Sequence, residues 1–307
     1  MHWTILGAGA IGCLWAAHLQ RAGAAVSLVL RSPDRLAQYR ARGGIVLIDE
    51  RGQSFCPVAA DLAGSPEPIE QLLICTKAYD SLAALESVWH RLNADSRILV
   101  LQNGLGSQQQ IVARAGAARV LVGSTTDGAY LRAPFEVVYA GRGVTAIGPF
   151  SETGARLAEP GTDFGLQLQQ DPQIETTLWR KLAINCAINP LTAIHGCRNG
   201  ALATTPAYTL ALKTLCSEFE AVARARGIAL FERPLQEEAL RVARQTADNY
   251  SSMLQDIRHQ RPTEIEQITG FLCNEARLAG VDVPQHQAML RQVRLLQHGA
   301  QPPSNQY

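Results

Sequence analysis

Short apolar runs and longer segments of helical periodicity alternate along the first half of the chain. The apolar runs are three to six residues long and are bounded by polar or glycine-containing turns, which is typical of buried strands. They cover residues 3–6, 25–30, 72–76, 97–101 and 120–122. Helices are expected between them, at 13–19 with an end near Gly23, at 35–42 and at 79–92. This alternation predicts βαβ units and a parallel sheet.

Two further pairs of short strands accompany this pattern. The strands of the first pair cover 45–48 and 55–59, and those of the second cover 136–140 and 143–147. Gly141-Arg142-Gly143 lies between the strands of the second pair, so we predict a β-hairpin there. One helix is expected within the Gly-, Pro- and Glu-rich stretch 151–163.

The alternation of strands and helices stops near Asp171-Pro172. From there the pattern predicts helices alone, at residues 173–188, 205–226, 233–257, 264–280 and 285–297. The chain is therefore expected to be an α/β protein with an α/β domain at residues 1–171 and an all-α domain at residues 172–307.

A glycine-rich motif joins the first predicted strand to the first predicted helix. Its six residues are Gly7, Ala8, Gly9, Ala10, Ile11 and Gly12. A G-x-G-x-x-G sequence is common in plain turns, but inside a βαβ unit of about 30 residues it indicates dinucleotide binding. Gly7 would permit the tight turn, Gly9 would let a pyrophosphate approach the helix N-terminus, and Gly12 would let the helix pack closely. The first domain is therefore expected to be a Rossmann-type dinucleotide-binding domain.

Arg31 stands at the end of the second strand, where an NAD site usually carries Asp or Glu. A guanidinium there suits a 2′-phosphate, which favours NADPH/NADP+ as the cofactor. The alternative interpretation is a solvated surface arginine. Asp34 follows Pro33 and is expected to be the N-cap of the next helix.

Two polar residues follow later strands of the predicted sheet. Lys77 comes after the strand 72–76, and Asn103 lies in Gln102-Asn103-Gly104 after the strand 97–101. Ligands of open parallel sheets bind outside the carboxyl ends of the strands, so Lys77 could pair with phosphates and Asn103 could bind ribose or substrate. Surface charge and Asn-Gly turn chemistry are the alternatives.

The helix predicted at 173–188 carries a polar stripe on an otherwise apolar surface. Lys181, Asn185 and Asn189 are spaced by four residues and therefore share one face. Such a stripe meets buried polar partners or lines a cleft that holds a polar ligand. Pro190 is expected to stop or kink the helix, which would turn Asn189 and the segment to Asn199 across the pocket.

A second polar group lies near the C-terminus. Asn249 and Ser252 are three residues apart and are expected to share a helix face. Thr263 and Glu266 have the spacing of a capping box, which would place Glu264 in the first helical turn. A carboxylate there is already favoured by the helix dipole, so a purely structural role for Glu264 stays open.

Composition excludes several classes of protein. A hydrophobic content of 47% and a charged content of 18% describe an ordinary globular protein, and a net charge of +1 favours neither nucleic acid nor an anionic membrane as a partner. No apolar run approaches the length of a membrane span, and no room for a signal peptide precedes the first strand. The seven scattered cysteines lack metal-ligand spacing, so we expect no metal site and free thiols in a reducing cytoplasm.

The sequence resembles the ketopantoate reductase (2-dehydropantoate 2-reductase) family, the NADPH-dependent enzymes of pantothenate synthesis. The resemblance covers nearly the whole chain. It rests on residues 5–12, Gln102-Asn103-Gly104, residues 178–193, Asn199-Gly200, residues 251–258 and Thr263-Glu264-Ile265.

The resemblance implies a role for each candidate residue. Lys181 would be the general acid, with Glu264 as its partner near the cofactor ribose. The substrate pocket would be lined by Asn103, Lys181, Asn185, Asn189, Asn199, Asn249 and Ser252. NADPH would contact the glycine loop, Arg31, Lys77, Asn103, Ala129 and Glu264. Asp127 is the exception, because a carboxylate pointing toward an anionic substrate would be unfavourable.

The residue types agree with reduction of a 2-oxo acid in a cleft between the domains. Negative charge grows on the ketone oxygen during hydride transfer, and an ammonium group can stabilise that charge and donate a proton. Two alternatives stay open: a reductase of another branched 2-oxo acid, and an NADP-binding regulator without turnover. A purely structural helical module fits less well, because it would need neither half of this site. The chain is expected to act as a monomer or homodimer.

Overall fold

The computed structural model describes residues 2–150 and 164–299. Internal contacts divide the chain into two compact units. The first unit comprises Met1–Gln102 and Ser107–Glu175, and the second comprises Asn103–Gly106 and Thr176–Tyr307. The helix expected within 151–163 lies outside the described residues.

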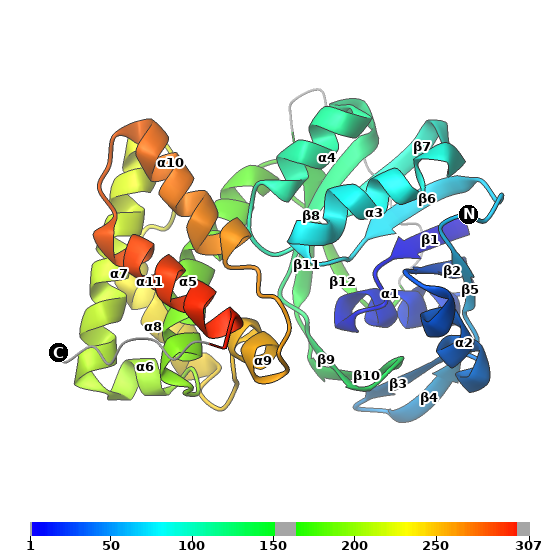
Figure 1. Cartoon of the computed structure of the whole chain (residues 1–307), viewed down its shortest axis with the longest axis horizontal. Coiled ribbons are helices and arrows are strands. Elements are labelled where there is room, and N and C mark those ends of the chain that lie inside the picture. Colours follow the sequence, from blue (N-terminus) through cyan, green and yellow to red (C-terminus); the bar gives the residue numbers. More distant parts are fainter. Residues whose placement is uncertain (1, 151–163, 300–307) are drawn as a thin grey trace. The chain divides into compact units, whose positions relative to one another are not determined.

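The first unit contains two β-sheets (Figure 1). Their strands are β1 (His2–Leu6), β2 (Ala25–Leu30), β3 (Ile45–Asp49), β4 (Gly52–Cys56), β5 (Ala59–Leu62), β6 (Ile69–Ile74), β7 (Leu92–Val100), β8 (Val120–Thr125), β9 (Gly128–Ala133), β10 (Glu136–Gly141), β11 (Val144–Pro149) and β12 (Gln167–Gln170). The large sheet has the order β12-β11-β8-β7-β6-β1-β2-β5. Its strands β8, β7, β6, β1, β2 and β5 are parallel to one another. The predicted parallel sheet is confirmed.

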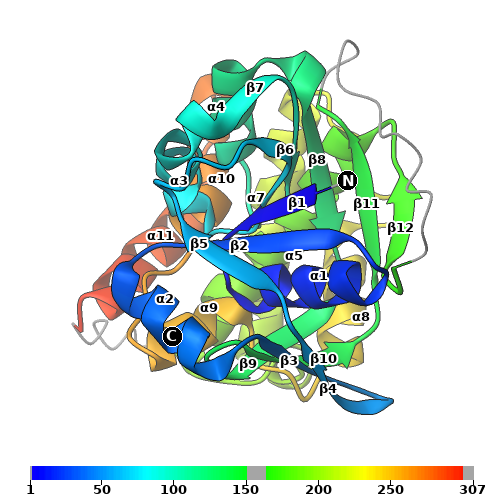
Figure 2. The same cartoon turned by 90° about the vertical axis from the view of Figure 1, so that its right-hand side faces the viewer.

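The small sheet has the order β4-β3-β10-β9 and shares the core of the first unit with the large one. The helices of this unit are α1 (Ala10–Arg21), α2 (Pro33–Arg42), α3 (Ser81–Ser87) and α4 (Ser107–Ala115). Figure 2 shows α1 beside strands of both sheets, and every residue from Gly12 to Leu19 is buried. A helix that is covered on all sides must be largely apolar all round, which explains the sequence of α1. His18 is the buried polar exception, and its Nδ1 lies 2.8 Å from Phe164 O.

The predicted hairpin at 136–147 is wrong, because its two strands belong to different sheets. β10 pairs with β9 and β3 in the small sheet, whereas β11 pairs with β8 and β12 in the large sheet. The strand predicted at 55–59 is likewise split between β4 and β5, which lie in different sheets. Local turn chemistry favours a hairpin but cannot show which distant strand supplies the better partner.

The second unit is helical. Its helices are α5 (Ile174–His195), α6 (Ala201–Thr204), α7 (Pro206–Ala225), α8 (Leu235–Gln245), α9 (Ser252–Arg258), a π-helical turn at Glu266–Gly270, α10 (Phe271–Ala279) and α11 (Pro284–Gln297). Trp179 of α5 contacts the rings of Phe219 and Phe271 at centroid distances of 6.0 and 5.7 Å, which joins three helices in one core. The predicted fold class is confirmed. No described helix is long and apolar enough to cross a membrane.

Pro190 does not end α5, which continues to His195. A proline inside a helix removes one hydrogen bond and costs about 3 kcal/mol. Asn189, Pro190 and Leu191 are all buried, so tertiary packing offsets that loss. The expectation that the helix stops at Pro190 is therefore wrong, whereas the passage of the segment to Asn199 across the pocket stays a prediction.

Three other local predictions also need correction. The helix expected at 233–257 is broken into α8 and α9, and Ser251 caps α9 by accepting a hydrogen bond from Leu254 N at 3.2 Å. The N-cap of α2 is Ser32 rather than Asp34, because Pro33 occupies the first helical position. The capping box does not form, since Thr263 N donates to Gln297 Oε1 and Glu266 pairs with Arg294.

Candidate active site

The glycine loop lies at the carboxyl end of β1, between that strand and α1. Gly7 has a φ of +101°, and a Cβ there would lie 2.6 Å from Thr76 N on the neighbouring strand connection. A Cβ on Gly12 would lie 1.9 Å from Gly7 O, so the first turn of α1 packs tightly against the loop. A Cβ on Gly9 would meet nothing within 4 Å. The loop is therefore closely packed at both ends and open at Gly9, beside the free N–H groups of the helix N-terminus.

The sheet topology brings several strand ends to the same edge as this loop. β1 and β6 are neighbours, although the chain passes from β1 to β2 on the opposite side of β1. Such a topological switch point is where ligands bind in open α/β sheets. The loop Gly7–Gly12 follows β1, Arg31 follows β2 and Lys77 follows β6, so these candidates share the carboxyl edge.

Arg31 has a second arginine near it that the sequence motifs did not indicate. Arg31 is exposed, and Arg35 lies one helical turn further on in α2. Burial lowers the pKa of Arg35, and the nearby charge of Arg31 lowers it further. The Arg35 guanidinium lies 4.2 Å from the ring centroid of Phe135 and donates to Gln38 Oε1 at 2.6 Å. Two cations thus lie close together after β2. The second could have been noticed in the sequence, because Arg35 follows Arg31 by four residues and begins the predicted helix 35–42.

Asp127 is held inside the first unit by its own hydrogen bonds. Its Oδ1 accepts from Tyr139 Oη at 2.5 Å and from Gly143 N at 2.9 Å, while Oδ2 accepts from Thr125 Oγ1 at 2.9 Å. Burial and the Asp127 carboxylate raise the pKa of Tyr139 to about 12. The carboxylate therefore links the β8–β9 connection to the β10–β11 connection. Ala129, the predicted cofactor contact, lies in β9 opposite Tyr139.

Replacing Asp127 with asparagine is expected to lower the free energy of unfolding by about 2–4 kcal/mol, because an amide cannot accept all of these hydrogen bonds. Urea unfolding at neutral pH measures the change. Asp95→Asn removes the same charge from an exposed position and serves as the control. Equal stability of the two variants would contradict a structural role for Asp127.

Helix α5 carries the polar stripe of the second unit. Lys181 and Asn185 are half-buried on successive turns, and Asn189 is only 8% exposed. Thr192, one turn further, forms a 2.7 Å hydrogen bond with the Ser251 hydroxyl. Because Ser251 caps α9, this bond ties the end of the stripe to the start of that helix.

The segment from Ala247 to Ser252 carries two further candidates and is attached to Asn199. Asn199 is buried, its backbone N–H donates to Asn249 O at 3.0 Å, and its Nδ2 donates to Thr246 Oγ1 at 2.9 Å. Asn199 and Asn249 are therefore neighbours. Asn249 precedes α9, so the expectation that it shares a helix face with Ser252 is wrong. The side chains of Asn249 and Ser252 are both exposed.

Asn103 and Glu264 come together although they are 161 residues apart in the sequence. Asn103 Nδ2 donates to Glu264 Oε2 at 3.3 Å, and Glu264 is only 5% exposed. Asn103 follows a strand of the first unit, but its short segment belongs to the second unit. Pairing of Glu264 with Lys181 stays a prediction.

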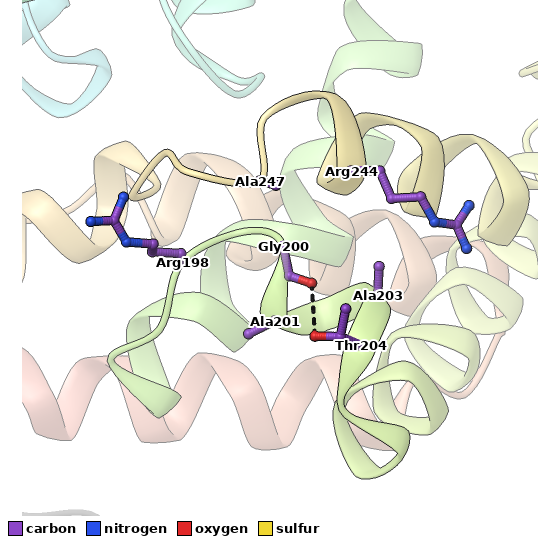
Figure 3. A pocket seen from close by; sticks show the side chains of 7 residues that line it. All are labelled: Arg198, Gly200, Ala201, Ala203, Thr204, Arg244 and Ala247. Atoms are coloured by element: carbon purple, nitrogen blue, oxygen red, sulfur yellow. Dashed lines mark hydrogen bonds between the residues drawn. The ribbon is translucent and has the colours of Figure 1, made fainter.

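Two cavities are lined by other residues. One of about 620 Å³ in the second unit is lined by Gly200, Thr204, three alanines, Arg198 and Arg244 (Figure 3). The other, of about 250 Å³ in the first unit, is lined by residues that include His18, Arg21, Asp49 and Arg142. No predicted site residue lines either cavity. The described residues contain no group of three or more His, Cys, Asp or Glu side chains that could hold a metal ion.

Two family models together cover most of the chain. The model described as ketopantoate reductase PanE/ApbA matches residues 3–152, and the model described as ketopantoate reductase PanE/ApbA C terminal matches residues 173–297. A 2-dehydropantoate 2-reductase of Vibrio cholerae is 36% identical over 97% of this chain and 98% of its own length. One from Archaeoglobus fulgidus is 32% identical over 96% of this chain and 97% of its own length.

Solved structures agree with this relationship. A ketopantoate reductase from Ralstonia eutropha is 27% identical, with a TM-score of 0.88 over 97% of this chain and 99% of its own. D-mandelate dehydrogenase in complex with NADH and anilino(oxo)acetate has a TM-score of 0.90 over 97% of this chain and 99% of its own, but at 23% identity it shows the fold alone. With both halves matched by family models, and with curated relatives aligned from end to end, this enzyme belongs to the ketopantoate reductase family.

Proposed function

We propose that this enzyme uses NADPH to reduce 2-dehydropantoate (ketopantoate) to (R)-pantoate, a step of pantothenate and coenzyme A synthesis. Residues 1–171 would hold the cofactor, and residues 172–307 would supply most of the substrate and catalytic groups. The observation that carries the proposal is the hydrogen bond of Asn103 to the buried Glu264. These two polar residues are far apart in sequence, and the unit that joins them also carries the Lys181 stripe. This arrangement favours a functional site over a solvated polar surface.

The first unit fits a dinucleotide. The space at Gly9 would admit a pyrophosphate, and the N–H groups at the start of α1 would donate to it. Arg31 would pair with the 2′-phosphate, with Arg35 adding positive charge, and Lys77 would contact phosphate from the end of β6. NADPH and NADP+ are therefore the proposed cofactors. When bound, NADPH supplies a hydride from C4 of its nicotinamide.

The second unit would bind the substrate and supply the proton. Lys181 would donate a hydrogen bond to the ketone oxygen, stabilise the growing negative charge and then release a proton to it. Glu264 would fix the position of the Lys181 ammonium. The asparagines at 103, 185, 189, 199 and 249 and the hydroxyl of Ser252 would bind the carboxylate and the 4-hydroxyl through neutral groups, which do not compete for the proton.

Asn199 differs from the other asparagines because it also holds neighbouring protein groups in place. Its Nδ2 is already bonded to Thr246, and its backbone holds Asn249. Besides its contact with the substrate, Asn199 would fix the position of Asn249.

Steady-state rates with a panel of 2-oxo acids test the substrate assignment. The enzyme should show its highest kcat/KM with ketopantoate and a markedly lower value with 2-oxoisovalerate, which lacks the hydroxyl that the polar groups would bind. An equal or higher value with 2-oxoisovalerate or an aromatic 2-oxo acid would assign the same scaffold to another substrate.

A further inference from the structure

Helix α10 is preceded by a π-helical turn, Glu266–Gly270. In a regular α-helix, Gln267 O would accept a hydrogen bond from Phe271 N. Here Phe271 N donates to Ile268 O, and Gly270 N reaches back five residues to Ile265 O at 2.9 Å. Because Phe271 N donates to Ile268 O, the Gln267 carbonyl does not accept the usual hydrogen bond from Phe271. Single π-helical turns within helices are frequent at functional sites.

A distant segment uses this carbonyl. Leu105 N donates to Gln267 O at 2.8 Å, and Leu105 is buried. Gly104 is the neighbour that permits the approach: its φ is +77°, and a Cβ there would lie 2.3 Å from Gln267 O. Any larger residue at position 104 would push the segment away from the turn.

The same segment carries Asn103, which faces Glu264. The Glu264 carbonyl accepts from Gln267 N at 3.1 Å and from Ile268 N at 3.0 Å, so the backbone of Glu264 is bound to the turn. Its carboxylate is bound by Asn103 at 3.3 Å. One turn thus holds both members of the Asn103–Glu264 pair, one through its own backbone and the other through Leu105.

We propose that the π-helical turn is a positioning device for the active site. Its irregular register releases the Gln267 carbonyl to hold Leu105, and this contact sets the amide of Asn103 against the carboxylate of Glu264. Gly104 and Gln267 are positioning residues, since they act through Asn103. The inference rests on the proposed function for its catalytic consequence, whereas the backbone contact can be tested without substrate.

Gly104→Ala tests the contact, with Gly116→Ala as the matched control. Both glycines have positive φ, +77° and +88°, so alanine strains the backbone at both. A Cβ on Gly116 meets nothing within 4 Å, so only Gly104→Ala adds a clash. Amide hydrogen exchange at Leu105 should become faster in Gly104→Ala and stay unchanged in Gly116→Ala. Unchanged exchange in Gly104→Ala would overturn the proposal.

A double-mutant cycle tests the catalytic consequence. Gly104→Ala should lower kcat/KM for ketopantoate by about 10²-fold, the usual scale for a small misplacement of a binding group. In an Asn103→Ala background the same change should add almost nothing, because its effect passes through Asn103. An equal loss in both backgrounds would overturn the positioning role.

Two further measurements separate a failure of the positioning proposal from misfolding of Gly104→Ala and from failure of the proposed function. Replacing the Leu105 amide by an ester removes the N–H donor without changing a side chain, and it should reproduce the loss of activity if Gly104→Ala fails to fold. Full activity of the ester variant would contradict the proposal. Wild-type enzyme that does not reduce ketopantoate would refute the proposed function, and hydrogen exchange at Leu105 would still decide whether the π-helical turn holds the segment.

Discussion

Replacing Lys181 with alanine is expected to lower kcat for ketopantoate reduction by about 10²-fold or more, the usual scale for loss of a general acid. The alanine variant should retain its fold, because Lys181 lies on a half-buried stripe of α5 rather than in its apolar core. The rate of NADPH oxidation at saturating substrate measures the effect. Affinity for NADPH, followed by fluorescence, should change far less than kcat.

Lys213→Ala is the matched control for this experiment. Lys213 is an exposed lysine of α7 in the same unit, so its loss removes the same charge without touching the polar stripe. The control should keep the wild-type rate. Wild-type turnover in Lys181→Ala, or an equal loss in both variants, would show that Lys181 is not the proton donor.

Replacing Arg31 with alanine is expected to weaken NADPH binding by about 1.5–3 kcal/mol, or roughly 10- to 150-fold, with little effect on NADH. The reason is that only NADPH carries the 2′-phosphate that the guanidinium would bind. Titration of cofactor fluorescence with each variant measures both affinities. Higher salt should reduce the difference between the cofactors, because Arg31 is exposed.

Arg40→Ala provides the comparison for Arg31→Ala, since Arg40 is an exposed arginine in α2. It should bind both cofactors as the wild type does. Arg35→Ala should weaken NADPH more than NADH, but less than Arg31→Ala does, because Arg35 is partly engaged with Gln38 and Phe135. An equal loss of NADPH and NADH affinity in Arg31→Ala would rule out the 2′-phosphate role.

The parallel sheet and the glycine loop could be predicted from local patterns alone. Each apolar run is short and bounded by turn residues, and the motif Gly7–Gly12 falls between a strand and a helix. Helix α4 and strand β12 were not predicted. The first begins with Ser107 and three glutamines, and the second is Gln167–Gln170, so neither has an apolar run that would mark it.

The failed hairpin shows what local patterns cannot contain. Gly141-Arg142-Gly143 reads as a turn, yet the flanking strands separate into two sheets. Asp127 holds this junction through Tyr139 and Gly143, which follow it by 12 and 16 residues. Nothing in the sequence around Gly141 indicates that a carboxylate from another connection organises it.

Pro190 and the break between α8 and α9 illustrate a second limit, because tertiary contacts add to local propensity or override it. Helix α5 continues through Pro190, where the neighbouring residues are buried. The break between α8 and α9 is held by hydrogen bonds from Gly200 N to Ala247 O and from Asn199 N to Asn249 O. The parts of the candidate site could be predicted from different kinds of information. The stripe on α5 follows from residue spacing, whereas the association of Asn103 with Glu264 could be expected only from the family resemblance.

Transfer of deuterium from NADPH to the substrate tests the central claim most directly. The enzyme would be mixed with ketopantoate and with NADPH that carries deuterium at both C4 positions, and the product would be examined by mass spectrometry and NMR. The account predicts pantoate with one deuterium at C2 for each NADPH oxidised. Binding of NADPH without formation of deuterated pantoate would contradict it, and would leave either a reductase of another 2-oxo acid or an NADP-binding protein without turnover.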